Sequence, residues 1–157
     1  MKPTKIIFLH GLEGSPTGQK ATAVKALAEK AGYKFIAPDL PRYDNDYALQ
    51  IAKKEIDKEG PDLIVASSRG ANIALHIIHE IPTLALAPSF RFFGPPKRVP
   101  SKLTVVHGVH DDVAPLPQSL ALVGQFGAKV VVTKDDHRLA ESLPVILQEL
   151  NLLLLRS

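Results

Sequence analysis

The chain has 157 residues, of which 45% are hydrophobic and 22% charged, and its formal net charge is +3. This length and composition predict one globular domain over residues 1–157. The mild positive charge contains no long basic run, so nucleic acid is not an expected partner. The absence of cysteine excludes disulfides, thiolate metal sites and a cysteine nucleophile.

The apolar segments are all short, and they predict neither a membrane span nor a membrane partner. The apolar run at residues 152–155 has only four residues, far fewer than a bilayer requires. Residues 1–9 resemble a signal peptide only faintly, because the apolar part is too short. We therefore predict a cytoplasmic protein. The sequence predicts no particular oligomeric state.

Short β-type runs alternate with helical patterns along the chain. This alternation predicts βαβ units and a three-layer α/β/α fold around a mostly parallel sheet. The six predicted strands cover residues 5–9, 34–37, 62–67, 83–87, 102–107 and 129–133. The third strand is almost continuously apolar, as expected for a strand covered on both faces.

The segments between the predicted strands carry helix signals. Ser15 and Pro16 have the residue types of an N-cap and a first helical position, so we expect the first helix to begin there and end near Gly32. Further helices are predicted over residues 46–59, after Ser68 and over 117–126. A last helix carries an apolar stripe, with Ser142 as its expected N-cap.

One stretch, residues 63–75, combines a strand, a tight turn and a helix. Two serines and a glycine separate an apolar run from residues with helical spacing. A nucleophilic serine at such a turn requires small residues two positions before and two after it. Ala66 and Gly70 satisfy this requirement around Ser68, although glycine is the usual residue at the first position.

Candidate partners for Ser68 follow the fifth and sixth predicted strands. A serine hydroxyl needs a base to take its proton, and that base needs a carboxylate to orient it. Asp111 follows the fifth strand and His137 the sixth. The C-terminal ends of parallel strands lie at one edge of a sheet, so the three residues are expected to converge there.

Four motifs in this order resemble the α/β-hydrolase superfamily, in particular its small bacterial serine esterases without a lid. The motifs are His10-Gly11 after the first strand, Ala66-x-Ser68-x-Gly70, His107-Gly108-x-x-Asp111-x-x-x-Pro115, and Asp136-His137. A strand-His-Gly-loop-Ser-Pro pattern and the run Ala-Pro-Asp-Leu-Pro at residues 37–41 also resemble these esterases. The resemblance spans the whole chain.

The resemblance implies a minimal fold with strand order 2-1-3-4-5-6, without a cap domain and without the first two strands of the family. It implies a Ser68–His137–Asp111 catalytic triad and an oxyanion hole made by the backbone N–H groups of Leu12 and Arg69. His10, Gly11, Phe90 and Phe92 are expected to border the substrate. No cofactor or metal is implied.

Several of these residues also have simpler interpretations. Asp112 is an alternative to Asp111 as the acid, although the spacing from His107-Gly108 favours Asp111. Asp136 has the character of a turn former, and His107 that of a structural residue at a strand end. His10 is expected to orient the oxyanion loop through hydrogen bonds, and His110 is a further candidate for the site.

Three other patterns suggest a metal site, a phosphate-binding loop or an RNA-binding surface, and each is weaker than the evidence for a serine nucleophile. His76 and His79 are one helical turn apart but lack a third metal ligand, so a metal site is not expected. Residues 14–22 partly match the phosphate-binding motif G-x-x-x-x-G-K-[ST], but Gln19 separates Gly18 from Lys20, which are adjacent in that motif. Aromatic and basic residues at 90–98 could stack on RNA, although their place after a strand favours a wall of the active-site cleft.

The predicted function is that of a serine hydrolase cleaving small carboxylic esters through an acyl-enzyme. The alternatives are a thioesterase or C–C hydrolase with the same triad, and a non-catalytic scaffold of this fold that binds a partner protein. The Arg69 side chain is expected to pair with a surface carboxylate, and contact with the substrate is the alternative.

Overall fold

The computed structural model describes residues 4–155; residues 1–3, part of the segment that faintly resembles a signal peptide, lie outside the described residues. Its strands form one six-stranded sheet in the order β2-β1-β3-β4-β5-β6, and all five strand pairings are parallel. The strands are β1 (Lys5–Leu9), β2 (Lys34–Ile36), β3 (Leu63–Ser67), β4 (Thr83–Leu86), β5 (Leu103–Gly108) and β6 (Lys129–Thr133). The predicted strand order and the predicted fold class are therefore confirmed, and the strand boundaries agree to within one residue.

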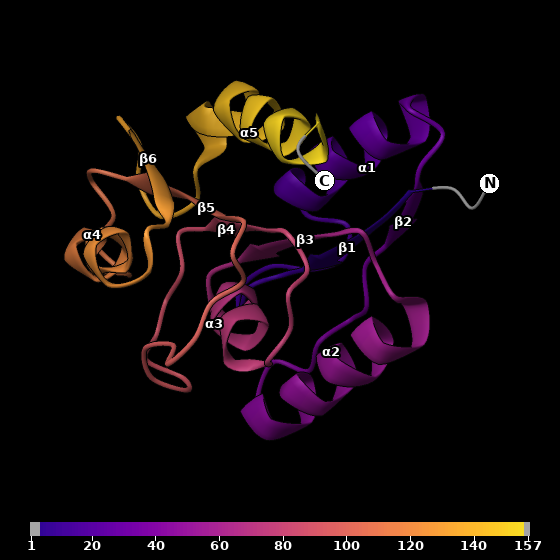
Figure 1. Ribbon diagram of the computed structural model, residues 1–157, viewed down its shortest axis with the longest axis horizontal. Helices are drawn as coiled ribbons and strands as arrows, with labels where there is room; N and C mark the ends of the chain where they lie inside the picture. Colours follow the sequence, from indigo (N-terminus) through magenta and orange to yellow (C-terminus); the bar gives the residue numbers. More distant parts are fainter. Residues whose placement is uncertain (1–3, 156–157) are drawn as a thin grey trace.

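Helices cover both faces of the sheet. Figure 1 shows α1 (Gln19–Lys30) and α5 (Leu143–Leu155) on one side, and α2 (Asn45–Glu59) and α3 (Arg69–His76) on the other. The remaining helix, α4 (Leu116–Phe126), lies beside the β6 edge and contributes Leu122 to the apolar cluster of the α2 and α3 side. A second cluster fills the space between the sheet, α1 and α5. The result is the predicted α/β/α sandwich.

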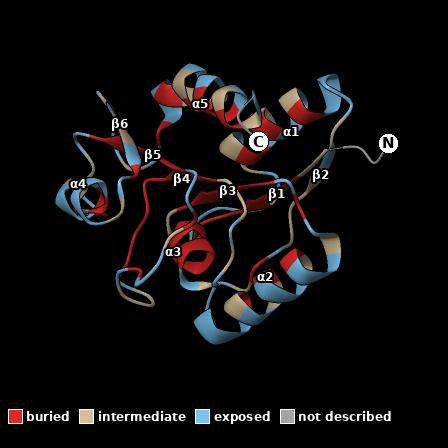
Figure 2. Cartoon of the chain, viewed as in Figure 1, coloured by how far each residue is buried: buried red, intermediate tan, exposed pale blue. Residues whose placement is uncertain are grey.

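The three strands β3, β4 and β5 are completely buried. Every residue of β3, β4 and β5 is buried, and Figure 2 shows that α3 is buried almost throughout while α2 exposes its outer face. Burial on both faces is the physical reason for the apolar sequence of β3. Among residues 4–155, no helix has both the length and the apolar character needed to cross a membrane.

One predicted helix start is wrong, and one predicted N-cap does not cap its helix. The chain makes successive turns after β1, with Gly14 N–H bonded to Gly11 O and Gly18 N–H bonded to Ser15 O, so α1 begins only at Gln19. The Ser15 hydroxyl accepts from the N–H of Thr17 within these turns, at 3.2 Å. The last helix, α5, begins at Leu143, directly after Ser142 as predicted. Ser142 also ends a short 3₁₀ turn, residues 140–142, and its hydroxyl lies 2.8 Å from Oδ2 of Asp135 instead of capping α5.

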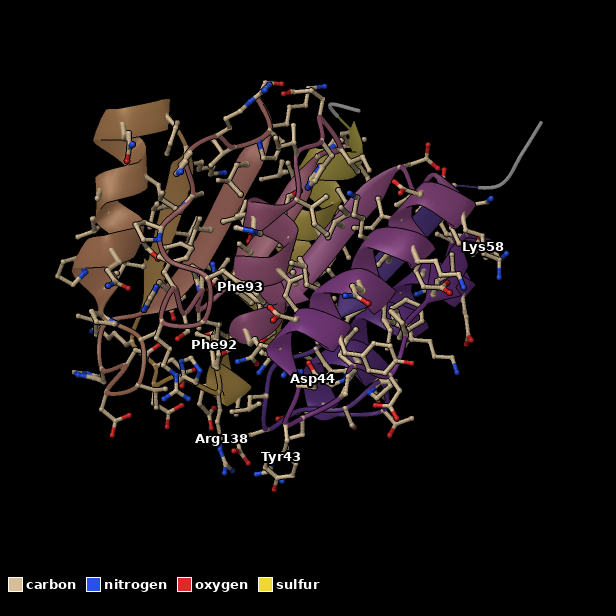
Figure 3. All side chains as sticks on the ribbon, turned by 90° about the horizontal axis from the view of Figure 1, so that it is seen from below. Tyr43, Asp44, Lys58, Phe92, Phe93 and Arg138 are labelled. Atoms are coloured by element: carbon tan, nitrogen blue, oxygen red, sulfur yellow. The ribbon has the colours of Figure 1, made fainter. Side chains whose placement is uncertain are left out.

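The parallel arrangement directs every strand's C-terminal end to the same edge of the sheet. The loops after β1, β2, β3, β4, β5 and β6 therefore meet there. Figure 3 shows Tyr43 and Arg138, which follow β2 and β6, at the lower edge of the molecule, with Phe92, which follows β4, above them and Lys58 near the far end of α2. This edge is where the predicted functional residues come together.

Candidate active site

Ser68 occupies a strained turn between β3 and α3. Its φ of 55° and ψ of −114° are uncommon for a residue with a side chain. The turn is held by backbone hydrogen bonds, because Ser68 N–H donates to Leu86 O and Ser68 O accepts from Ala71 and Asn72. Strain of this kind persists only where the surroundings enforce it. The turn places the Ser68 hydroxyl at the C-terminal edge of the sheet.

Gly70 is required by space in this turn. A Cβ atom at this position would lie 2.2 Å from the carbonyl oxygen of Leu9 and 2.8 Å from that of His10, both backbone atoms of the neighbouring strand and loop. The helix can begin this close to β1 only because residue 70 has no side chain.

Gly70→Ala is therefore expected to destabilise the protein by about 3 kcal/mol or more, since backbone must shift to accept the methyl group. Urea unfolding followed by circular dichroism measures the effect. The matched control is Gly124→Ala in α4, where a Cβ would meet no atom within 4 Å. That change should be neutral or stabilising by up to about 1 kcal/mol, because alanine favours helix. Equal losses in the two variants would contradict the close-packing argument.

Three side chains form a continuous hydrogen-bonded chain at this edge. The Oγ atom of Ser68 lies 2.9 Å from Nε2 of His137, and Nδ1 of His137 lies 2.7 Å from Oδ2 of Asp111. Since a carboxylate oxygen can only accept, Nδ1 of His137 carries a proton and Nε2 accepts from the Ser68 hydroxyl. This is the protonation pattern that lets an imidazole act as a base toward serine.

The Asp111 carboxylate is enclosed and oriented. Its side chain has no exposed surface, and Oδ1 accepts from the N–H groups of Val113 at 2.9 Å and Ala114 at 2.7 Å. This leaves Oδ2 for His137. The neighbouring Asp112 is exposed and borders the cleft without contacting His137. Of the two candidate acids, the structure brings Asp111 to the histidine.

The loop after β1 comes very close to Ser68. A Cβ placed on Gly11 would lie 3.0 Å from Cβ of Ser68 and 3.7 Å from its Oγ atom. His10 is buried and fastens this loop, because Nε2 accepts from the N–H of Leu40 at 2.9 Å and Nδ1 donates to the carbonyl of Gly11 at 2.7 Å. The predicted oxyanion donors, the backbone N–H groups of Leu12 and Arg69, take no part in the turn and loop hydrogen bonds of residues 4–155.

Asp135 supports the loop that carries His137. It is buried, and its carboxylate accepts from the N–H groups of Asp136 at 2.7 Å and Glu141 at 2.9 Å and from the Ser142 hydroxyl at 2.8 Å. Burial by itself acts to raise the pKa of Asp135. The hydrogen bonds from Ser142, Asp136 and Glu141 outweigh it, so the pKa lies below its ordinary value.

A lowered carboxyl pKa in the folded state makes stability depend on pH. The stabilisation is complete above the ordinary carboxyl pKa and is lost as the pH falls through the lower value of the folded state. Asp135→Asn should lower Tm by roughly 3–10 °C at pH 7. The difference from the wild type should shrink below about pH 4. Thermal unfolding from pH 7 to pH 3 tests this, and a constant difference throughout would contradict it.

A cleft of about 690 Å³ opens in front of Ser68 and His137. The Ser68 and His137 side chains line it, together with the loop after β1, the start of α1, Phe92 and Arg138. The Arg91 guanidinium lies over the Phe92 ring, with its Cζ atom 4.7 Å from the ring centroid. Phe90, predicted at the same wall, is instead 4% exposed and packs in the core beneath α3. The prediction of Phe90 as a substrate-bordering residue is wrong, because the segment turns this side chain inward.

The Arg69 side chain does not reach a surface carboxylate. It is fully buried, and Nη1 donates to the carbonyl of Arg42 and to Oδ1 of Asn45, both at 3.2 Å. Nε and Nη2 have no hydrogen-bond partner among the described residues. Burial lowers the pKa of the guanidinium below its ordinary value. The side chain ties the start of α2 to the start of α3, so the expected surface pairing is wrong.

Three further histidines, His76, His79 and His110, do not line the cleft. His110 is exposed and does not line the cleft. His76 stacks on Phe93 at 5.2 Å, and His79 bonds to the carbonyl of Ala74 at 2.9 Å. Across residues 4–155, no set of three or more histidine, aspartate or glutamate side chains is arranged so that it could hold a metal ion.

Sequence reasoning missed Asn72, which holds the wall segment of the cleft. It is buried on α3, donates to Gly94 O at 3.0 Å and accepts from Phe93 N–H at 2.8 Å. These two bonds fix the irregular segment that carries Phe92. An asparagine inside an otherwise apolar helical pattern was the available signal, since a buried amide needs partners.

Comparison with known proteins identifies the fold. No protein-family model and no curated protein sequence matches the chain. A putative hydrolase of the alpha/beta superfamily from Xanthomonas campestris pv. campestris is 22% identical, with a TM-score of 0.79 over 93% of this chain and 94% of the other. Est1E from Butyrivibrio proteoclasticus is 16% identical, with a TM-score of 0.79 over 99% and 88% of the two chains.

A third similar structure is described as an a/b serine hydrolase without a lid, also from Xanthomonas campestris. It is 14% identical, with a TM-score of 0.71 over 95% of this chain and 83% of the other. At such identities the agreement concerns the course of the backbone. Together with the parallel sheet and the strained serine turn, it shows that this chain has the α/β-hydrolase fold.

Proposed function

We propose that this protein is a serine hydrolase that cleaves small carboxylic esters through an acyl-enzyme. The observation that carries the proposal is the hydrogen-bonded chain from Ser68 through His137 to the enclosed Asp111. A partly buried network of this kind at the edge of a cleft, on a serine with strained backbone, is the arrangement that activates a serine nucleophile.

The reaction proceeds in two halves. Ser68 Oγ attacks the ester carbonyl while Nε2 of His137 takes its proton, and Asp111 stabilises the resulting imidazolium. The N–H groups of Leu12 and Arg69 stabilise the oxyanion. His137 then gives its proton to the leaving alcohol. A water molecule, activated by the same nitrogen, attacks the acyl group and regenerates Ser68.

The cleft favours short or aryl acyl groups over long fatty chains. Its walls are loops, and each buried methylene contributes only about 0.8 kcal/mol, so an open cleft gains little from chain length. Phe92 supplies an apolar wall. A structure of Est1E with ferulic acid bound supports an aryl ligand for a protein of this fold.

A panel of p-nitrophenyl esters from acetate to palmitate, with one aryl ester and one thioester, tests the proposal. We expect kcat/KM to be highest for acetate, butyrate or the aryl ester, and Ser68→Ala to serve as the blank. A fluorophosphonate probe should label wild-type Ser68. Absence of both labelling and hydrolysis would overturn the enzyme assignment and favour a non-catalytic role, and a dominant thioester rate would change the substrate class.

A further inference from the structure

A second buried histidine lies directly behind the Asp111 carboxylate. His107, near the end of β5, is 0% exposed, and its Nε2 atom lies 3.2 Å from Oδ2 of Asp111. This is the same oxygen that accepts from His137 at 2.7 Å. Asp111 is therefore held between two imidazole rings, one facing Ser68 and one facing the interior.

The contacts of His107 determine where its proton lies. Nε2 is 2.9 Å from the carbonyl oxygen of Ala114 and faces the Asp111 carboxylate, and both of these groups are acceptors only. Nε2 must therefore carry a proton. Nδ1 lies 2.7 Å from Oγ of Ser119, a fully buried residue of α4, and in the neutral ring it accepts from that hydroxyl.

These contacts hold both ends of the carboxylate. The bond from Nε2–H fixes the carbonyl of Ala114, and the N–H of the same residue bonds to Oδ1 of Asp111 at 2.7 Å. The positive N–H edge of the ring also faces Oδ2. A carboxylate free to rotate about its Cβ–Cγ bond would leave His137 without a fixed orientation, and positioning errors of this kind are costly in catalysis.

We propose that His107 and Ser119 are positioning residues for Asp111, extending the Ser68–His137–Asp111 chain by two buried groups. This inference rests on the proposed hydrolase function. Neither residue touches substrate: within the described part of the chain, neither lines the cleft. Their role is to orient the carboxylate, which in turn fixes the ring of His137.

The test compares His107→Leu, His107→Gln and Ser119→Ala with wild type. His107→Leu removes the N–H that faces Asp111 and should lower kcat at least about tenfold, as expected for a lost contact to a charged group, with KM within about twofold. His107→Gln returns an N–H donor and should recover most of kcat. Ser119→Ala removes only the hydroxyl and should have a smaller effect in the same direction.

The matched control is His79→Leu, which removes another histidine that bonds to a backbone carbonyl, at the opposite edge of the sheet. It should cost stability without changing kcat. A purely structural role of His107 would make His107→Leu behave like this control. Equal kcat values in the two variants, or no recovery with His107→Gln, would overturn the inference.

A spectroscopic measurement keeps this test independent of activity. The proton between Nδ1 of His137 and Asp111 should give a low-field proton NMR signal, identified by its loss in His137→Gln. His107→Leu should shift or broaden this signal, and His79→Leu should not. If wild-type protein neither reacts with the fluorophosphonate nor hydrolyses any ester of the panel, the proposed function is overturned, while the NMR comparison still decides whether His107 orients the Asp111–His137 pair. An unchanged signal in His107→Leu would refute the positioning role.

Discussion

Ser68→Ala and His137→Ala should each reduce ester hydrolysis by roughly 10⁶-fold while leaving the fold intact. Ser68 is bonded to Nε2 of His137 at 2.9 Å, so removing either residue stops proton transfer from the nucleophile. The double variant should be little worse than either single one, because the two residues act as a unit. Initial rates with p-nitrophenyl acetate and circular dichroism spectra measure both effects.

Ser101→Ala and His110→Ala provide the controls for this experiment. Both residues are exposed, and neither lines the cleft. They should retain wild-type rates to within about twofold, as expected for surface substitutions. Losses that add up in the Ser68→Ala/His137→Ala double variant would show that the two residues contribute independently, which contradicts the mechanism.

Asp111→Asn should lower kcat by roughly 10³–10⁴-fold, far more than Asp112→Asn. The Asp111 oxygens accept from two backbone N–H groups and from His137. An amide in this place must turn its NH₂ group toward one of these donors, which breaks a bond or imposes the wrong tautomer on His137. Steady-state kinetics at pH 7.5 with a short-chain ester measures the difference.

Asp112 provides the matched comparison, because it is the next residue and carries the same charge. Its exposed carboxylate lies at the cleft without a contact to His137, so its amide variant should affect chiefly KM. Similar kcat losses for the two variants, or a larger loss for Asp112→Asn, would assign the acid role to the other carboxylate.

Much of the architecture was predictable because it depends on local patterns. The period of the apolar residues identified the six strands, and β3, buried on both faces, is apolar along nearly its whole length. Parallel strands then bring loops distant in sequence to one edge. The spacing of Asp111 from His107 and Gly108, the last two residues of β5, was enough to favour Asp111 over its neighbour.

The failed predictions concern single side chains that respond to distant parts of the chain. Ser15 and Pro16 have the residue types of a helix start, yet the loop must first turn beside Ser68. Phe90 is aromatic beside a predicted cleft, yet it packs inward. Local propensity is a weak prior where such tertiary contacts compete with it.

The sequence by itself determined the α/β class, the strand positions and the three residues proposed for catalysis, since these depend on periodicity and on short motifs. Only the tertiary structure decided where Arg69 is buried, how Asp135 braces the loop of His137, and that His107 lies 3.2 Å from the Asp111 carboxylate. The physical reason is that burial and hydrogen-bond partners are properties of the packed chain. The buried Arg69 side chain, for example, bonds to Arg42 and Asn45, which lie 27 and 24 positions away in the chain.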